Sequence, residues 1–92
     1  MMTVVSVGNT DNRLTQQEWH AFVDEVRWLV AEFTDRTHFF GGPSNWAPWQ
    51  NVMWLFEMAE MDCAEFQAKL IRIREQYKQD SAFFMTGEGM FV

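Results

Sequence analysis

The chain has 92 residues, enough for one hydrophobic core and too few for two, so we expect a single domain over residues 1–92. Apolar residues make up 48% of it and aromatic residues 16%, which excludes a disordered segment. The net charge of −6 argues against a general nucleic-acid-binding protein, because neutralising phosphates requires a basic surface.

The same composition bears on membranes and on cell compartment. No apolar run approaches the roughly 18 residues of a membrane span, and the chain does not open on the charged and apolar regions of a signal peptide. Cys63 is the one cysteine and has no partner for an internal disulfide, which is typical of a reducing compartment. We therefore expect a cytoplasmic protein with neither a membrane nor a nucleic acid as its partner.

The first half of the sequence predicts a strand and then a helix. Residues 3–7 are mostly β-branched and are followed by a cluster of turn formers. Thr15 and Glu18 have the spacing of a capping box, and Leu14 and Trp19 that of a hydrophobic staple. The apolar residues that follow recur every three or four positions, which predicts one buried helix face: Trp19, Phe22, Val23, Val26, Leu29, Val30 and Phe33.

Two strands and a loop are predicted next. Residues 37–40 form a short strand candidate, and residues 50–58 a longer one in which Val52, Trp54, Phe56 and Met58 share a face. Between them, residues 41–49 contain two glycines and two prolines and must form a loop.

The last third predicts a second helix and a final strand. Asp62 and Glu65 again have capping-box spacing, with Met61 and Phe66 placed as a staple. The apolar face of this helix comprises Cys63, Phe66, Leu70, Ile73 and Tyr77. Residues 81–86 form the final strand, after which residues 90–92 could resume strand pairing.

The resulting order is β-α-β-β-α-β over nearly the whole chain. This order resembles the ferredoxin-like, split βαβ fold, an α+β architecture. The resemblance implies a four-stranded antiparallel sheet with both helices on one face. The alternative is another α+β layout in which the two middle strands form a loose hairpin.

The loop at residues 41–49 is the most distinctive candidate site. Asn45, Trp46 and Trp49 lie beside prolines, and large rigid side chains in a loop suit a binding surface. The alternative is that both tryptophans fold back over one end of the core.

The sheet itself is a second candidate. Both faces of residues 52–58 are apolar, and adjacent phenylalanines at 39–40 and 83–84 must point to opposite faces. We therefore expect an apolar face on the side without helices, used by a partner or covered by the loop or by residues 90–92. Trp28 lies off the apolar face of its helix, as a contact residue or as a cover for a neighbouring loop. Candidate partner-binding residues are thus Trp28, Phe40, Asn45, Trp46, Trp49 and Trp54.

Catalytic signals are weak. His20 and His38 lie on different predicted elements, and neither belongs to a pattern with metal-ligand spacing. Cys63 lacks a C-x-x-C partner, and no glycine-rich phosphate loop is present. We expect no cofactor, no metal and no assigned catalytic residue, so an enzyme is the less favoured class.

Three classes of function remain. The favoured class is an interaction protein that binds a partner protein, or a second copy of itself, through the aromatic loop and the apolar sheet face. In size, acidity and aromatic content the chain resembles small inhibitors encoded by bacteriophages, such as anti-CRISPR proteins. The alternative is a small-molecule binder or enzyme similar to ferredoxin-like α+β barrel dimers, with Trp54, Phe56, His38 and the Trp46 loop lining its pocket. An RNA-recognition module fits poorly, because residues 3–7 contain no aromatic side chain.

Overall fold

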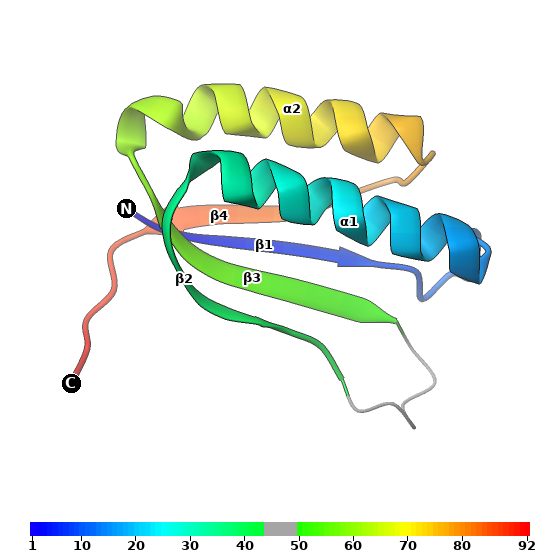
Figure 1. Ribbon diagram of the computed structural model, residues 1–92, viewed down its shortest axis with the longest axis horizontal. Helices are drawn as coiled ribbons and strands as arrows, with labels where there is room; N and C mark the ends of the chain where they lie inside the picture. The colour runs from blue at the N-terminus through cyan, green and yellow to red at the C-terminus, as the bar shows by residue number, and fades with distance from the viewer. Residues whose placement is uncertain (44–49) are drawn as a thin grey trace.

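The computed structural model describes residues 1–43 and 50–92 and has the predicted order of elements (Figure 1). These are β1 (Met2–Gly8), α1 (Gln16–Phe33), β2 (Thr34–Gly41), β3 (Asn51–Met58), the 3₁₀ turn η1 (Glu60–Asp62), α2 (Cys63–Gln76) and β4 (Phe83–Gly87). Within the described residues the fold is α+β, as predicted, with two α-helices and a four-stranded antiparallel sheet.

The strands lie in the order β2-β3-β1-β4. β1 is antiparallel to both β3 and β4, and β2 is antiparallel to β3. It follows that β1 and β2 are parallel with β3 between them, and that β3 and β4 are parallel with β1 between them. α1 and α2 lie side by side on one face of this sheet, and no helix of the described residues lies on the opposite face (Figure 1).

The start of α1 confirms the sequence interpretation. The Glu18 amide donates to Thr15 Oγ1 at 3.1 Å, and the Thr15 amide donates to Glu18 Oε1 at 2.9 Å. Each bond satisfies an amide that has no partner within the helix. The bond from the Thr15 amide to the carboxylate, followed by the nearby Thr15 side chain, favours the ionised form and lowers the pKa of Glu18.

The predicted start of α2 is wrong in its detail. Asp62 makes no side-chain cap hydrogen bond, because the chain enters α2 through η1 and Asp62 already has helical dihedrals (φ −89°, ψ −10°). An N-cap residue normally has extended backbone, which aims its side chain at the free amides. Met61 is 89% exposed, so it forms no staple with the buried Phe66.

The core lies between the sheet and the helices. Alternate residues of β1 and β3 point toward the helices and are buried, among them Val5, Trp54 and Phe56. Phe66 of α2 meets both Phe33 of α1 and Phe56 of β3, with ring centroids 5.7 Å and 5.6 Å apart. Residues 90–92 do not resume strand pairing. No helix in the described part of the chain is long and apolar enough to cross a membrane.

Candidate functional site

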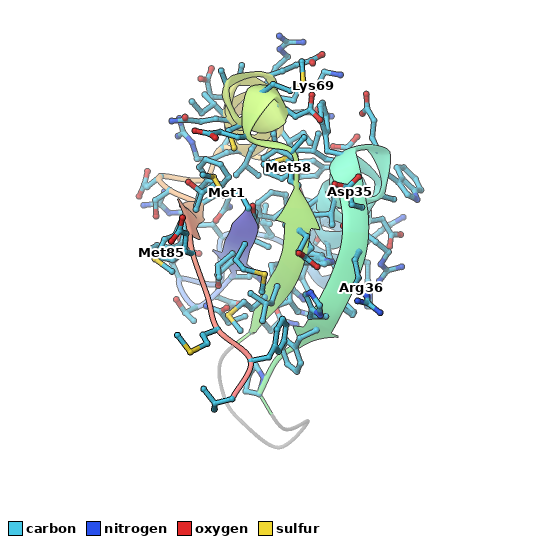
Figure 2. All side chains as sticks on the ribbon, turned by 90° about the vertical axis from the view of Figure 1, so that its left-hand side faces the viewer. Met1, Asp35, Arg36, Met58, Lys69 and Met85 are labelled. Carbon is cyan, nitrogen blue, oxygen red and sulfur yellow. The ribbon has the colours of Figure 1, made fainter. Side chains whose placement is uncertain are left out.

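The face of the sheet that carries no helix is apolar, as the sequence predicted. Strand register places one row of apolar side chains across all four strands: Phe39 opposite Leu55, Leu55 opposite Val4, and Val4 opposite Met85. Met2, Met53 and Phe83 extend this row on the same face. We call these seven residues the open face; Met85 lies at its β4 edge (Figure 2).

Much of the open face remains accessible to solvent. Phe39, Phe83 and Met85 are 47%, 55% and 52% exposed, and Met53 is 37% exposed. Their neighbours Val4 and Leu55 are half-buried. Monomeric proteins rarely leave contiguous apolar patches of more than a few hundred Å² exposed without using them for binding. This arrangement is therefore suited to binding another apolar surface.

Polar side chains beside the open face are paired with one another. His38 Nε2 lies 2.9 Å from Glu57 Oε2, and Ser6 Oγ donates to Asn51 Oδ1 at 2.8 Å. A polar group that is already hydrogen-bonded to a neighbour costs less free energy to desolvate when a partner displaces the water around it. The two hydrogen-bonded pairs are therefore compatible with a surface that a binding partner covers.

The C-terminal segment, residues 88–92, lies on the same side of the sheet as the open face, away from the helices (Figure 1). The Phe91 ring centroid is 5.3 Å from that of His38. A cavity of about 320 Å³ lies between this segment and the open face, lined on the sheet side by Met2, Val4, Leu55 and Met85. Met90 and Phe91 are 84% and 79% exposed, so the segment covers the open face only in part.

Three of the six sequence-predicted site residues are described by the structure, and of these Phe40 and Trp54 lie together whereas Trp28 lies apart on α1. Asn45, Trp46 and Trp49 lie outside the described residues. Trp54 is 2% exposed because β3 turns it toward the helices, so it belongs to the core and not to a contact surface. Phe40 is 44% exposed and packs against Trp54 at 5.0 Å between ring centroids.

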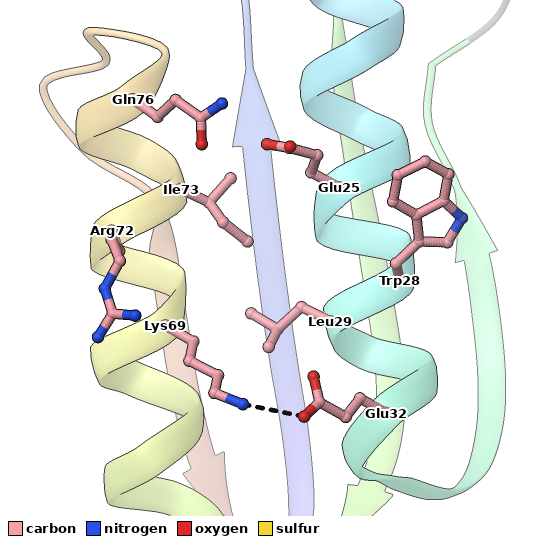
Figure 3. Close-up of a pocket in the computed structure, with 8 residues that line it drawn as sticks. All are labelled: Glu25, Trp28, Leu29, Glu32, Lys69, Arg72, Ile73 and Gln76. Atoms are coloured by element: carbon pink, nitrogen blue, oxygen red, sulfur yellow. Dashed lines mark hydrogen bonds and ion pairs between the residues drawn. The ribbon is translucent and has the colours of Figure 1, made fainter.

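Trp28 is 66% exposed on α1, at the rim of a groove of about 310 Å³ between the two helices (Figure 3). Its indole points away from α2, and the groove is floored by Leu29 and Ile73 (Figure 3). Lys69 Nζ bridges to Glu32 Oε1 at 2.9 Å, and this bond raises the pKa of Lys69. Phe40 and Trp28 both lie on the helix side of the sheet, away from the open face.

Glu25 lines the same groove, and its Oε2 atom is buried with no hydrogen-bond partner among residues 1–43 and 50–92. The phenol of Tyr77 lies near this carboxylate. Burial, followed by the negative charge of Glu25, raises the pKa of Tyr77.

Titratable residues do not assemble into a catalytic or metal centre in the part of the chain that the structure describes. His20 is exposed on α1, whereas His38 lies on β2. No group of three or more histidine, cysteine, aspartate or glutamate side chains is placed to hold a metal ion within residues 1–43 and 50–92.

Sequence reasoning predicted an apolar face here but did not name as site residues the side chains that define it most clearly. Leu55 and Val4 could be found from the alternation within their strands, but their alignment depends on the register between strands that are distant in sequence. The pairing of His38 with Glu57 depends on the same register. Comparison with protein-family models and with curated proteins found no match to this chain, so the site is argued from its own geometry.

Proposed function

We propose that this protein is a protein-interaction module that docks a partner protein on its open face. The row formed by Phe39, Leu55, Val4 and Met85 supports this proposal, because it crosses the whole sheet on the side without helices. Removing such side chains from water contributes about 25 cal/mol per Å² of apolar surface, against which the entropic cost of association must be set.

The chemistry of the open face indicates the kind of partner. Met2, Met53 and Met85 are unbranched and polarizable, so they can adapt to an irregular apolar surface. An inhibitor of the small phage-encoded type is the form of this function that we favour, because blocking a partner requires a surface and no catalytic group. The cytoplasm would suit such a module, since Cys63 has no second cysteine with which to pair.

The ferredoxin-like fold is part of this proposal. Two features support it: the order β-α-β-β-α-β, and the placement of β3 between β1 and β2 and of β1 between β3 and β4. Each helix then joins two parallel strands with room for a third strand between them, as in a split βαβ unit.

The test captures binding proteins from a lysate and then measures the affinity of each purified protein for this one. Immobilised wild-type protein, Leu55→Glu and Ile71→Glu are exposed to the same lysate, and proteins retained by the wild type are identified, purified and titrated. Leu55→Glu places a charge in the open face, whereas Ile71→Glu places one on an exposed site of α2 (39% exposed). We expect Leu55→Glu to weaken the purified complex at least about tenfold and Ile71→Glu to leave it unchanged. Equal binding by all three proteins would exclude the open face.

A small-molecule binder is the second candidate, and the cavity beneath residues 88–92 favours it. The cavity volume of about 320 Å³ lies at the lower end of the range for ligand pockets. The neutral fluorescent probe N-phenyl-1-naphthylamine tests this function. Saturable binding that Val4→Trp abolishes would support it, and so would a turnover that His38→Ala abolishes without unfolding the protein.

A further inference from the structure

The outer edge of β4 lacks the features that normally protect the end of a sheet. Its register with β1 runs without interruption from Phe83 to Gly87, and the strand contains neither a charged residue nor a proline. At the other end of the sheet, β2 has two register shifts and carries Asp35 and Arg36. Bulges and charges protect an edge strand from pairing with another chain. β2 is therefore a protected edge and β4 is not.

The direction of the β4 backbone groups follows from the hydrogen bonds of β1. Met1 and Met58 exchange both of their backbone bonds, each at 3.0 Å, and the Asn9 amide donates to the Gln50 carbonyl at 2.8 Å. In an antiparallel pair, the N–H and C=O of one residue point to the same side, and successive residues alternate. Odd-numbered residues of β1 thus bond to β3, and even-numbered residues bond to β4.

The same alternation fixes which residues of β4 face outward. Val4 lies opposite Met85 and is even-numbered, so Met85 points its backbone groups inward to β1, as do Phe83 and Gly87. The backbone groups of Phe84 and Thr86 then point out of the sheet. No other backbone group of the described residues bonds to them.

We propose that this edge pairs with β4 of a second copy of the chain, antiparallel and about a two-fold axis. The two outward residues lie symmetrically on either side of Met85. Phe84 of one copy therefore meets Thr86 of the second copy, and every outward N–H and C=O of both strands finds a partner.

Side chains favour the same pairing. Met85, 52% exposed, would lie opposite Met85 of the second copy, and Phe83, 55% exposed, would lie diagonally beside that methionine on the same face. Because β4 carries no charge, no like charges are opposed along the paired strands. The pairing uses the edge of the sheet, goes beyond the proposed docking function and leaves most of the open face available for a partner.

The experiment measures mass by sedimentation equilibrium up to about 1 mM protein. Thr86→Pro removes an outward N–H while keeping the inward bonds of Met85 and Gly87, and Thr86→Val keeps the N–H as the matched control. We expect wild type and Thr86→Val to form dimers. The dimer dissociation constant of Thr86→Pro should be at least about tenfold higher than that of wild type.

Three results would overturn the proposal. The first is a wild-type protein that stays monomeric throughout this range. The second is a Thr86→Pro variant that dimerises as the wild type does. The third is a dimer that Leu55→Glu dissociates and Thr86→Pro does not, which would place the interface on the open face.

A second measurement keeps the inference testable if Thr86→Pro does not fold. Amide hydrogen exchange of the wild type is followed at low and high protein concentration. The Thr86 and Phe84 amides should become protected as concentration rises, whereas the inward Met85 amide should be protected throughout. Rapid exchange at Thr86 and Phe84 at about 1 mM would overturn the proposed pairing.

Discussion

His38 of β2 and Glu57 of β3 meet on the side of the sheet that carries the open face, with 2.9 Å between Nε2 and Oε2. The His38 side chain is 18% exposed and that of Glu57 38% exposed, so the pair is partly shielded from water. Phe91 packs against the imidazole ring. The pair therefore connects the edge strand β2 to β3 and supports the position of the C-terminal segment.

Replacing Glu57 with glutamine should weaken the fold only slightly. The variant keeps the shape of the side chain and removes its charge, and half-exposed pairs of this kind contribute up to about 1 kcal/mol. Urea denaturation at neutral pH measures the change in the free energy of unfolding. A loss of more than about 3 kcal/mol would show that the pair behaves as a buried one.

The two helix starts should respond differently to the loss of their polar residue. Thr15→Ala removes the cap of α1 and should cost about 1 kcal/mol. Asp62→Ala removes no cap hydrogen bond and should stay within about 0.5 kcal/mol of wild type. Both values come from urea denaturation followed by circular dichroism. Equal losses would mean that Asp62 caps α2 in solution.

The capping box also predicts a pH dependence. The pKa of Glu18 is lowered in the folded state by its bonds to Thr15, so its ionised form contributes stability above the ordinary value of 4.5. That contribution is lost as the pH falls through the lowered pKa. Glu18→Gln keeps an acceptor for the Thr15 amide but does not titrate. The deficit of Glu18→Gln in the free energy of unfolding, relative to wild type, should therefore be constant near neutral pH and shrink as the pH falls below 4.5. A deficit in the free energy of unfolding that grows on acidification would contradict a stabilising role for ionised Glu18.

Local signals were sufficient to predict most elements. The capping box at Thr15 and Glu18, and the alternation through Trp54 and Phe56, involve residues close together in sequence. Propensity and periodicity report such local geometry directly. The same kind of signal was misleading at Asp62, because the 3₁₀ turn before it changes the backbone direction, and no side-chain pattern records that turn.

The candidate site depended on non-local geometry, which the sequence could not supply. Val4 and Leu55 are distant in the chain, yet they lie side by side on the open face. An apolar open face was predictable, because adjacent phenylalanines in a strand must point to opposite faces. The composition of its central row was not, because a shift of one residue in register would have exchanged Leu55 for Trp54.

The C-terminal segment should be dispensable for folding and should limit access to the open face. Ending the chain after Gly87 removes residues that make no hydrogen bond to the rest of the described chain, so stability should stay within about 0.5 kcal/mol of wild type. The truncation also removes Met90 and Phe91 from above the cavity. Emission from the dye anilinonaphthalene sulfonate, which reports exposed apolar surface, should therefore rise. Phe91→Ala should produce a smaller rise, because it removes one of the contacts and keeps the rest of the segment. Unchanged emission in the folded truncated protein would mean that residues 88–92 do not cover the open face in solution.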